Sequence, residues 1–194
     1  MELDSIHSLD PASPHHFLAR SPKVPVLREL AEYARQFADP DKTVQDIAEE
    51  LGLALHRDMK FDAKATDVDT PIAEAFEKRH GVCQDFTHIM IGCLRSLGIP
   101  AGYVSGFLRT IPPEGKPRLE GADAMHAWVR IWCGASAGWA EYDPTNAIFA
   151  NADHIVIARG RDYFDVAPVK GILRTAGAQK SEHFVDMVQV EAGA

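Results

Sequence analysis

The sequence predicts an α+β fold in which helices come first and an antiparallel sheet follows. In the first half of the chain, apolar residues recur at three- and four-residue steps, the spacing of one helix face. After residue 100, short apolar runs of strand composition are separated by hairpin-length connections. Helices and strands that are segregated along a chain in this way are typical of helices packed on an antiparallel sheet.

Four helices are expected before the first strand. The first begins at Val24, and Asp41 is the expected N-cap of the second. The third starts with Pro71 at its first helical position and runs to His80. The fourth follows Gly81 and carries a continuous apolar stripe, formed by Phe86, Ile89, Met90, Cys93, Leu94 and Leu97.

The strand signals follow Pro100. Runs 101–108, 125–132, 138–143, 154–158 and 184–190 are the expected strands, with a turn at 112–115. Residues 1–20 show no period and are expected to be an extended lead-in. The remainder, residues 21–194, is expected to form one domain, because 194 residues suffice for one domain and scarcely for two.

Charge and hydropathy exclude two classes of partner. The formal net charge is −8 and the sequence pI is about 5.5, so neither nucleic acid nor an anionic membrane surface is an expected partner. The longest uncharged apolar stretch, residues 96–108, is shorter than the roughly 20 residues that a membrane span requires. Composition does not predict an oligomeric state.

Cysteine usage favours a reducing compartment. Three cysteines cannot all pair within one chain. Cys83 and Cys93 are expected on one helix, where ten residues separate their Cα atoms by roughly 15 Å, too far for a disulfide. Because the N-terminus also lacks the basic and apolar regions of a secretory signal, we expect a cytoplasmic protein.

Cys83 is a candidate nucleophile. It is expected in the first turn of a helix, where unpaired backbone N–H groups and the positive end of the dipole favour thiolate. Cys93 lies on the apolar stripe and fits a buried small hydrophobe, the commonest role of a free cysteine. Cys83 lies off the stripe, and its position alone leaves both interpretations open.

A second pair, His126 and Asp143, fits a base and its orienting acid. If 125–132 and 138–143 form a hairpin that turns between Gly134 and Ala135, His126 falls opposite Asp143, at cross-strand distance. Alone, His126 also fits a structural histidine and Asp143 a turn residue before proline. Cysteine at a helix start, followed by histidine and aspartate on neighbouring strands, is the arrangement that thiol catalysis needs.

Three separated motifs carry a family resemblance. The run GVCQDFTHIMIGCLRSLGIPAGYVSGFL, then DAMHAWVRIW, then GWAEYDPTNAIFANADHIVIARGRDYFDVAPVKG, closely resembles the transglutaminase-like superfamily, whose bacterial branch is described as candidate cysteine proteases. The resemblance covers about residues 20–190. It implies a papain-like core, with Cys83 as nucleophile, His126 as base and Asp143 as orienting acid.

The sequence thus predicts a thiol acyl-transfer enzyme that cleaves peptide or side-chain amide bonds of a peptide or protein substrate. Trp128, on the same strand face as His126, is a predicted substrate contact. No CxxC pair or HExxH motif is present, so no metal or cofactor is expected. Two alternatives remain: transfer to an amine, as in protein crosslinking, and a non-catalytic peptide-binding module that retains the fold.

Overall fold

The computed structural model describes residues 10–109 and 124–168, together with residues 3, 6, 8, 171, 176–177, 185–188 and 190. Its helices are η2 (Pro14–Phe17), α1 (Arg28–Ala34), η3 (Arg35–Phe37), α2 (Val44–Asp58), α3 (Ile72–Lys78), α4 (Cys83–Ser96) and α5 (Tyr163–Val166). Its strands are β1 (Lys60–Phe61), β2 (His80–Gly81), β3 (Ala101–Leu108), β4 (Ala124–Trp132), β5 (Trp139–Asp143), β6 (Ile148–Phe149) and β7 (His154–Gly160).

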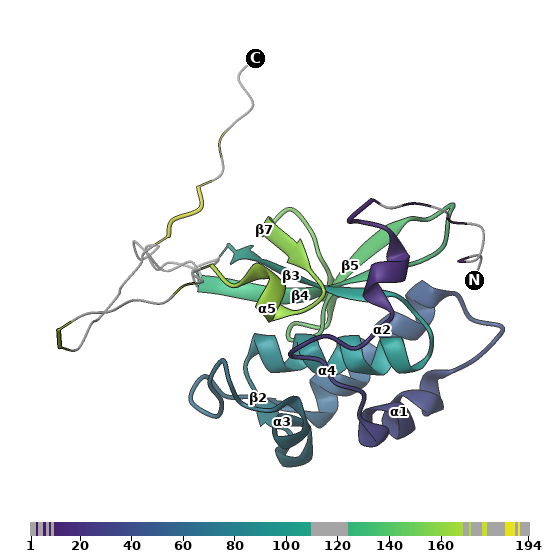
Figure 1. Ribbon diagram of the computed structural model, residues 1–194, viewed down its shortest axis with the longest axis horizontal. Coiled ribbons are helices and arrows are strands. Elements are labelled where there is room, and N and C mark those ends of the chain that lie inside the picture. The colour runs from purple at the N-terminus through teal and green to yellow at the C-terminus, as the bar shows by residue number, and fades with distance from the viewer. Residues whose placement is uncertain are drawn as a thin grey trace, which may run out of the picture.

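The main sheet is antiparallel, which confirms the predicted α+β class. Its strands follow the order β6-β5-β4-β3-β7, and every neighbouring pair is antiparallel. Figure 1 shows α1 to α4 gathered on one side of this sheet, with α4 running beneath β3 and β4. Within the described ranges, no helix is long and apolar enough to cross a bilayer.

The core lies between α4 and the sheet. The predicted apolar stripe of α4 is confirmed, since its members from Phe86 to Leu94 are at most 1% exposed and pack in one cluster with Ala127, Val129 and Ile131 of β4. Complete burial of a Leu, Ile, Met or Phe side chain stabilises a fold by roughly 1.5–3 kcal/mol. This packing fixes the start of α4 relative to β4.

The other face of β4 carries the polar and aromatic side chains. Side chains alternate along a strand, so His126, Trp128 and Arg130 point away from the α4 core. Gly106 of β3 pairs with His126, and a Cβ at this glycine would collide with the Ile155 carbonyl and the Trp128 ring. The absence of a side chain at position 106 therefore makes room for the tryptophan beside His126.

Three predicted helix starts are wrong. The first helix, α1, begins at Arg28, four residues after the expected Val24, which instead forms an isolated β-bridge with Ser21. The other two are wrong by one or two residues. Thr43, not Asp41, caps α2: its Oγ1 accepts from the Asp46 N–H at 3.1 Å, and Asp46 accepts from the Thr43 N–H at 3.0 Å. This reciprocal capping box satisfies two helix-end donors, which a lone Asp41 could not do. Pro71 is the N-cap of α3 rather than its first residue, and the helix ends at Lys78 rather than His80.

The N-terminal segment is not extended throughout. Residues 14–17 form the 3-10 helix η2, and Phe17 is buried against the sheet with its ring 5.1 Å from that of Trp139. The burial of one aromatic side chain explains why this segment folds back onto the strands.

The strand predictions hold for β3, β4, β5 and β7, but the hairpin register is wrong. Val129 pairs with Tyr142, so the turn is centred one residue later than expected and the pairing is offset by two residues. The expected strand at 184–190 is not observed in its described residues, which form no regular structure. The expected turn at 112–115 lies outside the described residues.

Candidate active site

Cys83 is the first residue of α4, as predicted. Asp85, three residues after Val82, caps this helix start. Its Oδ2 accepts from the Val82 N–H at 2.8 Å and from Thr66 Oγ1 at 2.5 Å. A Cβ on Gly81 would lie 2.6 Å from the same carboxylate oxygen. Glycine at position 81 thus allows the Asp85 carboxylate to fold back and cap the turn that carries Cys83.

His126 interacts with both of the other predicted residues, Asp143 and Cys83. Its Nε2 lies 2.7 Å from Asp143 Oδ2. The ring also interacts with the Cys83 thiol through a hydrogen bond and through charge. Because Nε2 is engaged by Asp143, Nδ1 is the ring nitrogen left to face Cys83.

The register error does not separate His126 from Asp143. Continuing the observed pairing places Asp143 beside Trp128, two residues along from His126. Since side chains alternate with a period of two, an offset of two keeps Asp143 on the face of His126, as a diagonal neighbour. The two side chains are therefore in contact although the predicted register is wrong. An offset of one residue would have placed them on opposite faces of the sheet.

Asp143 is fully buried and accepts hydrogen bonds from three side chains and two backbone groups. Its Oδ2 accepts from His126, from Asn146 Nδ2 at 2.7 Å and from His154 Nε2 at 3.2 Å. Its Oδ1 accepts from the N–H groups of Thr145 and Asn146, at 2.9 and 3.2 Å. Five donors around one carboxylate offset the cost of burying its charge.

This cluster requires a curled sheet. Asp143 ends β5 and His154 begins β7, and two strands lie between them in the sheet order, yet their side chains touch. The chain passes from β5 to β7 through residues 144–153, which include the short strand β6. The curl brings residues from three strands to the end of α4.

The electrostatics favour an ionised carboxylate and a protonated imidazole. Burial lowers the pKa of His126, but the hydrogen bonds and charges of Asp143 and Cys83 outweigh burial and raise it to about 10. Burial also raises the pKa of Asp143, but the hydrogen bonds from His126, His154 and Asn146 prevail and hold that pKa below its ordinary range. A charged imidazole is thereby placed beside the Cys83 side chain.

The three cysteines are free and have different environments. Cys93 is completely buried, and burial raises its pKa to about 12. Burial also raises the pKa of the half-buried Cys133. Cys83 alone among the three interacts with a histidine that an acid holds, which sets its thiol apart chemically.

Trp128 does not have the exposure that a substrate contact needs. Its side chain is 0% exposed, and its indole N–H donates to Glu141 Oε2 at 2.8 Å. The ring instead packs beside the cluster, stacked on His126 with centroids 6.1 Å apart and edge-on to His154 at 5.1 Å. The prediction that Trp128 contacts substrate is therefore corrected: it supports the two histidines from within the fold.

Comparison with known proteins identifies the family of this chain. The model of the transglutaminase-like superfamily matches residues 31–144, which include Cys83, His126 and Asp143. The chain belongs to this superfamily. Among the curated relatives of this chain are uncharacterized proteins of Mycobacterium tuberculosis and Mycobacterium bovis. Each is 39% identical to it over 165 residues, which are 84% of this chain and 51% of theirs. The chain therefore spans about half the length of the curated relatives it matches.

Two solved structures resemble this transglutaminase-like chain. A candidate cysteine protease from Cytophaga hutchinsonii superposes with a TM-score of 0.70 at 22% identity, over 86% of this chain and 52% of that one, which supports the fold. The periplasmic domain of TgpA from Pseudomonas aeruginosa, bound to ethylmercury, gives a TM-score of 0.50 at 27% identity, over 73% of this chain and 51% of that one.

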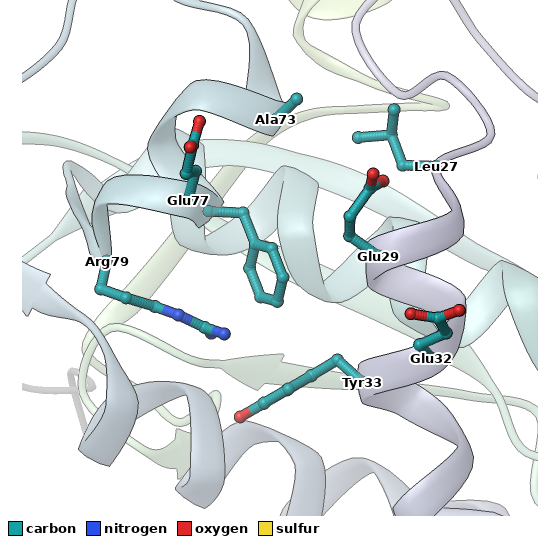
Figure 2. Close-up of a pocket in the computed structure, with 8 residues that line it drawn as sticks. Leu27, Glu29, Glu32, Tyr33, Ala73, Glu77 and Arg79 are labelled. Atoms are coloured by element: carbon teal, nitrogen blue, oxygen red, sulfur yellow. The ribbon is translucent and has the colours of Figure 1, made fainter.

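Pocket size does not point to the Cys83 site. A pocket of about 610 Å³ lies between α1 and α3, where Figure 2 shows Tyr33, Arg79 and three glutamates around it. The Arg79 guanidinium lies over the Phe76 ring, 4.0 Å from its centroid. None of the residues that line this pocket belongs to the cluster of Cys83, His126 and Asp143, so the chemistry and not the volume identifies the candidate site.

Within the described residues, His126, Asp143 and His154 are a group whose donor atoms could hold a metal ion, since these atoms lie within 4.8 Å of one another. Their contacts, however, are those of a carboxylate accepting N–H groups, and the predicted absence of a metal stays a prediction.

The sequence did not single out three residues of the site: His154, Asn146 and Asp85. His154 is one of nine histidines and begins β7, and no spacing in the sequence sets it apart from the others. Asn146 follows Asp143 in a turn, where asparagine is common for reasons of backbone conformation alone. Asp85 could have been found, because an acid three residues after an expected N-cap is the sequence signature of a cap.

Proposed function

We propose that the protein is a thiol acyl-transfer enzyme that hydrolyses peptide or side-chain amide bonds, with Cys83 as nucleophile, His126 as general acid and base and Asp143 as orienting acid. One observation carries the proposal: the His126 ring interacts with Cys83 and is bonded through Nε2 to the buried Asp143. Membership of the transglutaminase-like superfamily supports it.

Each proton and bond in the proposed reaction is accounted for. The Cys83 thiolate attacks the carbonyl carbon of the amide, and the developing oxyanion faces the N–H of Cys83, one of the donors that a helix start leaves unpaired. The C–N bond then breaks, and the leaving amine takes the proton of His126 Nδ1. Water attacks the resulting thioester, His126 accepts its proton, and cleavage of the C–S bond releases a carboxylic acid.

The proposal also names a setting and a substrate class. Cys83, Cys93 and Cys133 are all free, which suits a reducing compartment, and we place the enzyme in the cytoplasm. The substrate is a peptide or protein, because the proposed reaction needs an amide carbonyl and a leaving amine.

Mass spectrometry of bacterial peptides and proteins, incubated with the enzyme and a primary amine, tests this proposal against both alternatives. Hydrolysed amide products that require Cys83 support it. Incorporation of the amine favours transglutaminase-type transfer instead. No change with either acceptor favours a peptide-binding module. The Cys133→Ala variant is the matched control, since it removes a half-buried thiol that lies outside the cluster and should behave as wild type.

A further inference from the structure

His154 contacts the same carboxylate oxygen as the proposed general base. Its Nε2 lies 3.2 Å from Asp143 Oδ2, the oxygen that also accepts from His126 Nε2 at 2.7 Å. The two histidines lie on different strands, His154 at the start of β7 and His126 near the start of β4, on either side of β3. Asp143 therefore bridges two imidazoles, of which the proposed reaction uses only one.

The surroundings of His154 fix which of its ring nitrogens donates to Asp143. The ionised Asp143 carboxylate can only accept, so Nε2 is the ring nitrogen that donates to it. Nδ1 lies 3.2 Å from the Asn151 backbone nitrogen, which donates to it, and 3.3 Å from Asn151 Oδ1. The side chain is buried, and the Trp128 ring packs edge-on against it. His154 is thus held with one N–H directed at Asp143.

We propose that His154 is a positioning residue for the acyl transfer, which holds the Asp143 carboxylate with its Oδ2 turned toward His126. This inference rests on the proposed function. His154 acts through Asp143, as the outer imidazole of the hydrogen-bonded chain His154–Asp143–His126.

The effect of removing the His154 N–H depends on the charged and titratable groups around Asp143. On the site side they are His126 and the Cys83 thiol, and behind Trp128 lies the ion pair of Glu141 and Arg159, 2.7 Å apart. The N–H of His154 is one of the hydrogen bonds that lower the pKa of Asp143 against burial. Without it, the Asp143 carboxylate stays ionised but loses one of the donors that orient its Oδ2, so the charged form of His126 beside Cys83 is less favoured.

The pH dependence of Cys83 alkylation by iodoacetamide, resolved by peptide mass spectrometry, tests this chain of effects. His154→Phe keeps a ring but removes both nitrogens, whereas His154→Gln retains an N–H donor. We expect the acidic limb of the Cys83 rate profile to move upward by about one pH unit in His154→Phe, the size of one hydrogen bond to a charged group. His154→Gln should restore most of this shift.

A purely structural role would lower the thermal midpoint, or lower the alkylation rate equally at every pH, without moving the limb; that result would overturn the inference. If His154→Phe does not fold, His154→Ala with added imidazole replaces it, and failure of imidazole to move the limb back would also overturn it. The wild-type profile separates this outcome from failure of the proposed function, because a Cys83 that reacts no faster than Cys133 would reject the nucleophile itself.

Discussion

The start of α4 and the cluster around Asp143 build their parts of the site in different ways. Cys83 is placed by its neighbours in the chain, since Gly81 and Asp85 shape and cap its turn. Asp143 is placed by tertiary structure, because its partners come from other strands: His126 from the neighbouring β4, and His154 from β7 at the far edge of the sheet. The comparison teaches that the nucleophile depends on a local cap, whereas the acid depends on the curl of the whole sheet.

The largest effect should follow from removal of the nucleophile. Cys83→Ala should abolish acyl transfer, with a loss on the order of the 10⁶-fold found when a catalytic nucleophile of a serine hydrolase is removed. Stability should change little, because the Cys83 side chain is only partly buried at the end of the helix. Single-turnover acylation and the thermal midpoint are measured together, with Cys133→Ala as control. Retained turnover in Cys83→Ala would exclude thiol catalysis.

Asp143→Ala should give the next largest effect, and here activity and stability should both fall. Removal of an orienting carboxylate costs up to about 10⁴-fold in a serine triad, and less is expected where a helix already stabilises the thiolate. Asp143→Asn should be milder in acylation, because an amide oxygen can still accept from His126. Its NH₂ group must then face the N–H groups of Thr145 and Asn146, so its thermal midpoint should fall as well.

A matched buried carboxylate separates these two effects. Asp162 is also fully buried and accepts two backbone N–H groups, from Lys23 at 2.6 Å and Phe164 at 2.8 Å, but no histidine. Asp162→Ala should melt early while its folded fraction acylates normally. If Asp143→Ala behaves in the same way, Asp143 is only a turn former and Cys83 and His126 act as a dyad.

A smaller effect should follow from loosening the cap of α4. Asp85→Ala frees the Val82 N–H and lets the turn of Cys83 fray, at a cost of about 1 kcal/mol, so alkylation of Cys83 should slow by less than about tenfold. Asp46→Ala removes the equivalent cap from α2, far from the cluster in the chain. It should lower the thermal midpoint similarly and leave the alkylation rate unchanged. Equal slowing in both variants would mean that the cap affects only global stability.

The same difference explains what the sequence could predict. The stripe of α4 and the place of Cys83 follow from periodicity and helix-end chemistry, which neighbouring residues determine. The hairpin register failed because one residue in the turn, between Gly134 and Gly138, moves the pairing by two, and turn length is weakly encoded. The contact between His126 and Asp143 was still predicted correctly, because an offset of two residues leaves both side chains on the same face of the sheet.

His154 and Trp128 mark the limit of prediction. Alternation along β4 placed Trp128 on the correct face, but only the curl of the sheet shows that this face is covered, which turned an expected substrate contact into a buried support. In a flat sheet, two strands would separate His154 from Asp143, and the two side chains would be out of reach of each other. Strand order and curvature depend on contacts across the whole domain, and no local pattern in the sequence carries them.

The smallest expected effect is that of metal removal, and it tests whether the Asp143 cluster serves the thiol or a metal. His126, Asp143 and His154 form a donor set that could hold a metal ion, and a metal-bound water would then replace Cys83 as the nucleophile. In the thiol mechanism, N–H groups of the two histidines already donate to the Asp143 carboxylate. Dialysis against EDTA should therefore leave amide hydrolysis unchanged. Added Zn²⁺ should not raise the rate above that of the untreated enzyme. Loss of activity in EDTA, restored by Zn²⁺ and retained in Cys83→Ala, would instead assign the chemistry to the three residues around Asp143 and leave α4 with a structural role.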